Sequence, residues 1–199
     1  MIEVPDATRI WHDIAFEDIY YEHCSYFTPG SLARALRRAG FAVTDLRREY
    51  DDQYLVAEAS LDPGEDRVFD IEDTVPALKQ AVSEFTARYP DRLQAWQDFF
   101  GRTNAEDRVA IWGSGSKCVA FLRTLGVVQH IDLIVDINPH RRGRFAPGVP
   151  VEISTPDACR SADPGLVIMM NGVYENEIRS DLAGMGLSPR VATLDRVPA

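Results

Sequence analysis

The residues best suited to hold a phosphate form one short glycine-containing stretch, Gly113-Ser114-Gly115-Ser116-Lys117. An apolar run at 109–112 predicts a strand before it, and residues 117–125 predict a helix after it. The backbone N–H groups of such a turn, together with the helix N-terminus, could bind an anion. The alternative is a tight turn that merely needs glycine.

An acidic residue follows at the position where dinucleotide-binding folds hold a ribose hydroxyl. Asp136 ends the next predicted strand, 23 residues after Gly113. Cys118 stands where the third glycine of that fingerprint is expected. Without this glycine the helix cannot pack closely on the strand, which disfavours an NAD-dependent oxidoreductase.

The densest positive charge follows the same predicted strand, in His140-Arg141-Arg142-Gly143-Arg144, shortly after Asn138. Ligands of open α/β sheets bind at the carboxyl edge of the strands, where this loop is expected. The guanidinium groups of Arg141, Arg142 and Arg144 could therefore clamp a diphosphate. A solvated charged loop is the alternative.

A third group of reactive side chains lies in the irregular segment Tyr20-Tyr21-Glu22-His23-Cys24-Ser25-Tyr26-Phe27. Irregular segments often carry catalytic residues. His23 is the natural base near neutral pH, and Glu22 or a tyrosine could orient it or share its proton. A histidine that is only a structural neighbour of aromatic rings remains the alternative.

Composition narrows the classes of partner. The chain has 199 residues, 45% of them hydrophobic, and a formal charge of -10, which disfavours a surface for nucleic acid. No apolar stretch approaches the roughly 20 residues that cross a bilayer. Cys24, Cys118 and Cys159 form no Cys-x-x-Cys pair, so neither a disulfide framework nor a metal site is expected. We expect a cytoplasmic protein with reduced cysteines.

The second half of the chain reads as a small doubly wound parallel sheet. After residue 107 the order is strand, glycine turn, helix, strand, followed by an apolar run at 166–170, a helix at 175–185 and a strand at 191–194. Before it, apolar residues recur every three or four positions, predicting a connecting helix at 75–104 that Pro90 should kink or divide.

The first half predicts the end of a different sheet. A helix at 31–39 capped by Thr28 precedes strands at 41–46 and 54–59 joined as a hairpin. Residues 2–5 read as the end of a buried strand with nothing before it to pair with, and residues 11–27 as mostly loop. We therefore expect three parts: a remnant at 1–60, a solvated linker at 61–74 and a Rossmann-like domain at 75–199.

These motifs, in this order, resemble the C-terminal part of class I S-adenosylmethionine-dependent sugar C-methyltransferases. The resemblance is carried by Glu3-Val4-Pro5, Tyr20-x-Glu22-His23-x-Ser25-Tyr26-Phe27-Thr28, Ala39-Gly40-Phe41, Gly113-x-Gly115, Asp136-x-Asn138-Pro139, Gly143, Pro147-Gly148, Asn171 and Glu177-Ile178. It implies an α/β fold in which a partial methyltransferase sheet and a long helix precede a Rossmann-like parallel sheet.

The resemblance also implies a function. Tyr20, Glu22 and His23 would perform acid-base work on a keto-deoxysugar nucleotide, since removing a proton beside a ketone makes that carbon a nucleophile. Gly113, Ser114, Gly115, Ser116, Lys117, Asp136, Asn138, Arg141 and Arg144 would bind the nucleotide sugar. S-adenosylmethionine is the implied methyl donor.

The donor's glycine-rich motif has no counterpart before Ile2. We therefore expect the chain to be inactive alone and to bind substrate, with a donor-binding chain or a second copy joined through residues 1–60. The alternative is a non-catalytic binding or assembly module derived from a methyltransferase.

Overall fold

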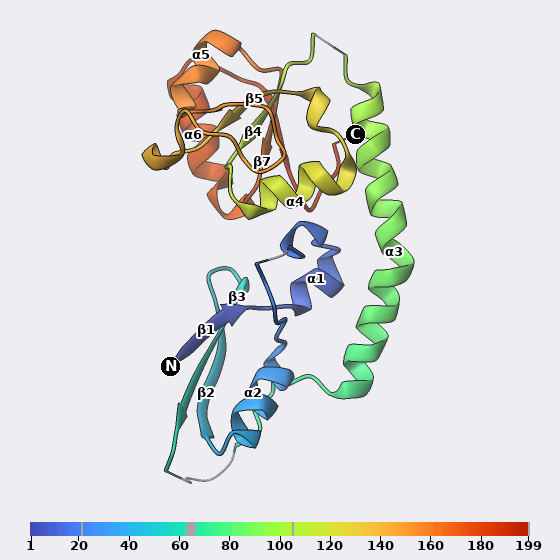
Figure 1. Ribbon diagram of the computed structural model, residues 1–199, viewed down its shortest axis with the longest axis vertical. Helices are drawn as coiled ribbons and strands as arrows, with labels where there is room; N and C mark the ends of the chain where they lie inside the picture. The colour runs from blue at the N-terminus through green and yellow to red at the C-terminus, as the bar shows by residue number, and fades with distance from the viewer. Residues whose placement is uncertain (21, 63–66, 105, 199) are drawn as a thin grey trace. The chain divides into compact units, whose positions relative to one another are not determined.

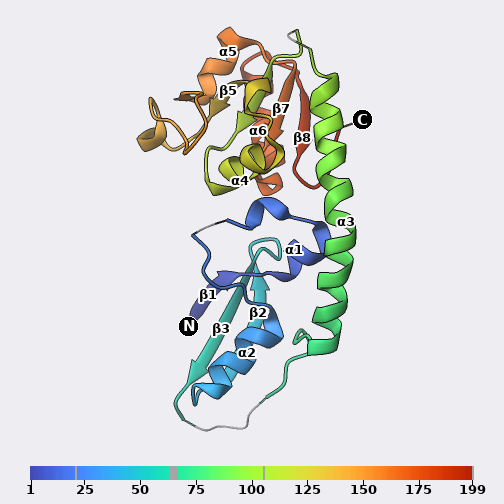
Figure 2. The same cartoon turned by 45° about the vertical axis from the view of Figure 1, so that its right-hand side comes forward.

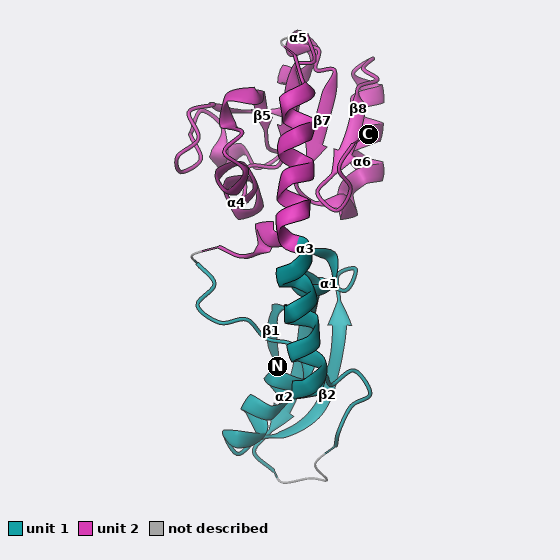
Figure 3. Cartoon of the chain, turned by 90° about the vertical axis from the view of Figure 1, so that its right-hand side faces the viewer, with its two compact units in different colours: residues 1–14, 21–88 teal, residues 15–20, 89–199 magenta. Residues whose placement is uncertain are grey.

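The computed structural model describes the chain except for residues 21, 63–66, 105 and 199 (Figure 1). Its contacts divide the chain into two compact units (Figure 3). Unit 1 comprises Met1–Ile14 and Tyr21–Arg88, and unit 2 comprises Ala15–Tyr20 and Tyr89–Ala199. The division differs from the predicted borders in two places: residues 15–20 pack with the C-terminal half, and residues 75–88, predicted to open the second domain, belong to unit 1.

Unit 1 is a three-stranded antiparallel sheet with helices. Its elements are β1 (Ile2–Pro5), α1 (Thr8–Asp13), α2 (Pro29–Arg38), β2 (Ala42–Glu49), β3 (Tyr54–Ser60) and the first part of α3 (Val75–Arg102). The strand order is β1-β3-β2, so the predicted hairpin is present. Its core joins one face of α2 to the sheet through Leu32, Ala33, Leu36, Val43, Leu46, Leu55 and Ala57.

One expectation for this unit is wrong. β1 is not a buried strand: three of its four residues are exposed, and it pairs with β3, which follows it in the chain. The segment 11–27, predicted as mostly loop, holds the end of α1 and the 3-10 helix η1 (Phe16–Asp18) and no other helix or strand among its described residues. Their apolar residues are buried by tertiary contacts, which one-dimensional periodicity does not reveal.

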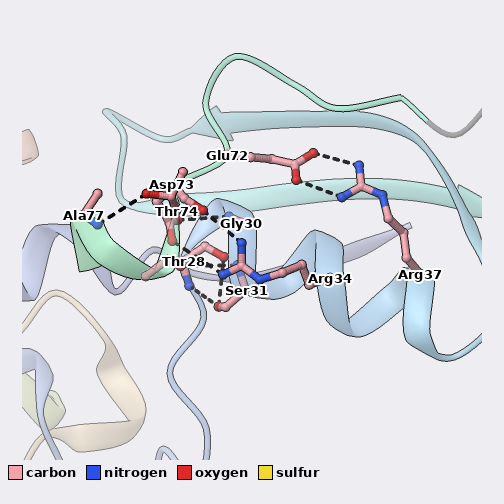
Figure 4. A network of polar contacts seen from close by, with 9 residues as sticks. All are labelled: Thr28, Gly30, Ser31, Arg34, Arg37, Glu72, Asp73, Thr74 and Ala77. Carbon is pink, nitrogen blue, oxygen red and sulfur yellow. Dashed lines mark hydrogen bonds and ion pairs between the residues drawn. The ribbon is translucent and has the colours of Figure 1, made fainter. Parts of the chain in front are cut away.

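Side chains at the start of α2 fasten the residues before α3 to it (Figure 4). Thr28 and Ser31 form a reciprocal capping box, as the predicted Thr28 cap requires. Gly30 donates its N–H to the Asp73 carboxylate at 3.0 Å, and a Cβ at Gly30 would clash with the Asp73 carbonyl. Arg37 clasps Glu72 with both terminal nitrogens, at 2.7 and 2.8 Å.

The contacts of residues 69–73 differ from those expected of a solvated linker at 61–74. Phe69 and Ile71 pack against the core of unit 1, and Glu72 and Asp73 bind α2. Residues 63–66, with Pro63 and Gly64, lie outside the described residues. The second half of the segment is therefore part of unit 1 and not a solvated connection.

Unit 2 is built on the predicted parallel sheet. Its elements are η1, the rest of α3, β4 (Val109–Trp112), α4 (Ser116–Leu125), η2 (Val128–His130), β5 (Ile131–Val135), η3 (Pro139–Arg141), β6 (Ile153–Ser154), η4 (Pro156–Ala158), α5 (Cys159–Ala162), β7 (Leu166–Met169), η5 (Gly172–Tyr174), α6 (Glu175–Gly184) and β8 (Arg190–Thr193). The order β6-β5-β4-β7-β8 is parallel throughout, which confirms the Rossmann-like fold class.

Alternate residues of the central strands bury both faces of this sheet. Ile111 and Ile168 face the helices α3 and α4, whereas Ala110 and Val167 face α5 and α6. Figure 2 shows the second part of α3 running beside the sheet. In the sheet, β4 has β5 on one side and β7 on the other, so the order of the strands reverses at β4. Ligands of open α/β sheets bind at such a reversal.

The helix α3 continues through Pro90, so the expectation that the proline divides it is wrong. Proline removes one backbone hydrogen bond of a helix. Here the following turns carry Trp96, Phe99 and Phe100, whose side chains are at most 4% exposed. Their burial outweighs the local defect, and the helix forms in one piece.

Candidate functional site

A pocket opens at the carboxyl edge of the unit 2 sheet, where the strand order reverses. Its volume is about 150 Å³. Trp112 ends β4 and Gly113 follows it, Asp136 follows β5, and Met170 follows β7, so the carboxyl ends of three neighbouring strands meet at the pocket. The other lining residues are Ile137, Asn171, Tyr174, Glu177, Ile178 and Asp181.

Glycine is required at the base of this pocket. Gly113 has a φ of +104°, which side-chain-bearing residues rarely adopt, and a Cβ there would lie 3.2 Å from the Cβ of Met170. Its N–H donates to the carbonyl of Val135 at 2.8 Å. The chain after β4 can therefore pass close to Val135, which ends β5, and to Met170, which follows β7.

Asp136 organises the turn beside the pocket. Its Oδ2 accepts hydrogen bonds from the Ser114 N–H at 2.8 Å and the Ser114 hydroxyl at 2.6 Å. Nη1 of Arg141 donates to the same oxygen at 3.2 Å and to Oγ of Ser114 at 3.3 Å. The N–H of Asn138 donates to Oδ1 at 2.8 Å.

These contacts keep Asp136 ionised. Partial burial would raise the pKa of its carboxyl group. The hydrogen bonds from Ser114 and Asn138 and the charge of Arg141 act in the opposite direction and prevail, so the pKa lies below its ordinary value. A carboxylate that holds Arg141 in place is thus present across the neutral range.

The structure narrows the predicted anion site to the second half of the turn. The N–H groups of Gly113 and Ser114 are already committed within the protein. Within the described parts of the chain, the N–H groups of Gly115, Ser116 and Lys117 meet no acceptor, as expected at the start of α4. The guanidinium of Arg141 lies over Gly115, where a Cβ would be 3.4 Å from Nη1.

The remaining predicted substrate-binding residues take different positions. Lys117 extends its ammonium group to Asp18, with Nζ at 3.0 Å from Oδ1. The Asn138 side chain caps η3 by accepting from the His140 N–H at 3.0 Å. Arg142 and Arg144 are exposed and form no ion pair with any described residue. Among the arginines of the basic loop, Arg141 is the one that contacts the turn, through Ser114 and Asp136.

The predicted acid-base residues fall in two units. Tyr20 is half-buried and closes the segment that belongs to unit 2, whereas Glu22 and His23 belong to unit 1. The His23 imidazole meets the ring of Tyr26 edge-on, with 5.8 Å between ring centres. Tyr21 of the same motif lies outside the described residues.

Sequence reasoning did not assign the pocket wall formed after β7. Asn171, Tyr174, Glu177 and Asp181 come from the β7–α6 connection and α6. The available signal was the predicted strand at 166–170, because its carboxyl end had to reach the same sheet edge as Gly113 and Asp136.

Asp136 stands at the end of the second strand, and its Oδ2 already accepts three hydrogen bonds within the protein. This carboxylate could therefore offer a ribose diol mainly Oδ1, which accepts one hydrogen bond, from the N–H of Asn138. Among the described residues, no group of three His, Cys, Asp or Glu side chains could hold a metal ion. None of the described helices is both long and apolar enough to span a bilayer.

Comparison with known proteins assigns the second half of the chain. Residues 72–187 match the family model described as the C-methyltransferase C-terminal domain. Comparison with curated proteins finds no match. The match includes the turn, the pocket and most of the parallel sheet. Membership in a methyltransferase family indicates, in general terms, that S-adenosylmethionine is the methyl donor. The chain belongs to the C-methyltransferase C-terminal domain family and is the C-terminal part of a C-methyltransferase.

Proposed function

We propose that this chain binds the nucleotide sugar of an S-adenosylmethionine-dependent C-methyltransferase that acts on a keto-deoxysugar nucleotide. The observation that carries the proposal is the pocket at the switch point of the parallel sheet, directly beside a turn with unpaired backbone donors and Arg141. Such a place is where open α/β sheets bind nucleotides.

Charge and lining divide the site between the parts of the ligand. The pocket presents Trp112, Met170 and Ile178, and its charged groups are carboxylates. Carboxylates repel phosphate, so the pocket suits the uncharged nucleoside portion. The diphosphate would bind outside it, between the start of α4 and Arg141, where N–H donors and a guanidinium converge.

Tyr20, Glu22 and His23 would serve the sugar. His23 would accept the proton from the carbon beside the ketone, and Glu22 or Tyr20 would orient the imidazole or donate to the ketone oxygen. Support for these roles comes from the residue types and their order in the motif.

Isothermal titration calorimetry tests the proposal. We expect heat on adding a nucleoside diphosphate sugar, little heat with S-adenosylmethionine, and weakened binding in Arg141→Met. Arg160→Met is the matched control, because Arg160 is also half-exposed and pairs with a single carboxylate, that of Asp157. Absence of heat with every nucleoside diphosphate sugar would contradict the proposal.

A second candidate function, an assembly module, is favoured by the edge of the unit 1 sheet. β1 pairs with β3 on one side and has no strand on the other among the described residues, and Ile2 is 41% exposed. Light scattering after size-exclusion chromatography separates the two. A dimer that Ile2→Lys dissociates favours assembly, and a monomer that binds nucleotide favours the first proposal.

A further inference from the structure

A short segment of the chain leaves unit 1 and packs in the core of unit 2. Phe16 is 3% exposed and stacks on Phe121 of α4 with 6.1 Å between ring centres. Its ring also meets Tyr89 of α3 edge-on at 6.0 Å. The segment Ala15–Tyr20 is thus held by the same helix that begins at the glycine turn.

An ion pair fastens this segment to the first turn of α4. Nζ of Lys117 lies 3.0 Å from Oδ1 and 3.1 Å from Oδ2 of Asp18. Both side chains are about one-fifth exposed, at 23% and 19%. Lys117 is the second residue of α4, so its backbone N–H is one of the unpaired groups at the start of the helix.

Both cations of the turn are therefore engaged by carboxylates before any ligand arrives. Arg141 is paired with Asp136, and its other nitrogens remain open among the described residues. The compact ammonium of Lys117 is shared by both oxygens of Asp18. A phosphate at the start of α4 would attract this ammonium, because their charges are opposite. It would repel the Asp18 carboxylate, because both groups are negative.

The segment ends where the acid-base motif starts. Tyr20 is its last residue, and Glu22 and His23 follow two and three positions later. At its other end Ile14 is buried at 3% exposure with a φ of 57°, a conformation unfavourable for a β-branched side chain. Release of the segment would relieve this strain.

We propose that Asp18 is a positioning residue that couples phosphate binding at the Gly113–Lys117 turn to the segment Ala15–Tyr20, which precedes Glu22 and His23 in the chain. The phosphate and Asp18 compete for Lys117. Phosphate binding loosens Ala15–Tyr20, and docking of this segment weakens phosphate binding by the same factor. The proposal rests on the proposed function, since it takes the ligand's phosphates to bind at this turn.

Hydrogen-exchange mass spectrometry and calorimetry on the full chain test the coupling. A nucleoside diphosphate should speed amide exchange in residues 15–20, whereas the corresponding nucleoside should not. Asp18→Asn should speed this exchange without ligand and tighten binding of the nucleoside diphosphate about fivefold, as expected for removing a competitor worth about one ion pair. Asp157→Asn, which alters an exposed pair distant in sequence, should change neither.

The outcomes separate this inference from the proposed function. If no nucleotide binds, the proposed function fails, and pyrophosphate then serves as the probe of the turn. Unchanged exchange with a bound phosphate compound, or weaker binding in folded Asp18→Asn, would overturn the coupling. Should Asp18→Asn not fold, Lys117→Met provides the second variant, in which exchange in residues 15–20 is fast and no longer responds to ligand.

Discussion

Two arginine–carboxylate pairs in this molecule show how similar chemistry serves different ends. In unit 1, Arg37 and Glu72 form a two-pronged pair (Figure 4) whose side chains are 17% and 7% exposed. Glu72 also accepts a hydrogen bond from the N–H of Phe69. In unit 2, Arg141 touches Asp136 with one nitrogen at 3.2 Å, and the arginine side chain is 42% exposed.

The difference lies in what remains for a ligand. The first pair is saturated and joins segments 35 residues apart, so it stabilises the fold. The second pair leaves guanidinium donors open beside a pocket, and its carboxylate is occupied in orienting them. We infer that incomplete pairing, more than the presence of a pair, marks the arginine that serves a site.

Glu72→Gln should act on stability alone. The substitution removes the charge that Arg37 clasps and weakens the attachment of residues 69–73 to α2. We expect the free energy of unfolding to fall by about 2 kcal/mol. Urea denaturation measures this loss. Nucleotide affinity should be unchanged, and a large change in affinity would show that the pair is not purely structural.

Gly113→Ala should affect both stability and the pocket. A methyl group at a φ of +104° is strained, and it would press on the Met170 side chain. We expect a loss of about 2 kcal/mol together with loss of nucleotide binding. Gly126→Ala is the matched control: its φ is +70° but no atom lies within 4 Å of the added Cβ, so it should cost less and leave binding intact. Equal binding losses in both variants would refute a specific role for the turn.

Acid should weaken the Arg37–Glu72 pair by protonating Glu72, since arginine stays charged. The hydrogen bond from Arg37 holds the pKa of Glu72 below its ordinary value, more than offsetting burial. A depressed folded-state pKa stabilises the protein above the unfolded-state value of about 4.5. That contribution is lost as pH falls through the lower folded-state pKa. Wild-type stability should therefore drop more steeply below pH 4.5 than that of Glu72→Gln, and parallel curves would contradict this assignment.

Arg141→Met should change binding with little effect on stability. An arginine that is 42% exposed and pairs with one carboxylate through one nitrogen adds at most about 1 kcal/mol to folding. Losing its open donors should weaken nucleoside diphosphate binding about tenfold, measured by calorimetry. Arg144→Met should change affinity less than twofold, because Arg144 pairs with no described residue. If Arg144→Met weakened binding as much, the loop as a whole, and not Arg141, would carry the charge.

Much of unit 2 follows from local sequence rules. The apolar run ending at Trp112, the glycine turn and the helix after Ser116 are a strand–turn–helix pattern read from nearest neighbours, and all are present. The right-handed crossover rule then places β4 beside β5 in parallel. The cap at Thr28 was predictable for the same reason, since its partner Ser31 is three residues away.

Only the tertiary structure decided which side chains of these motifs meet and which remain open. The sequence by itself determined the parallel sheet, the turn and the sheet edge at which the pocket opens, because each depends on residues close together in the chain. It could not show that Ser114 and Arg141 converge on Asp136, that Lys117 turns to Asp18, or that Phe16 enters the core of unit 2. The Ser114–Asp136, Lys117–Asp18 and Phe16–Phe121 contacts join residues 22, 99 and 105 positions apart (121 − 16), and the Arg141–Asp136 contact depends on how a short loop returns. Such pairings are set by packing in three dimensions, which no local pattern records.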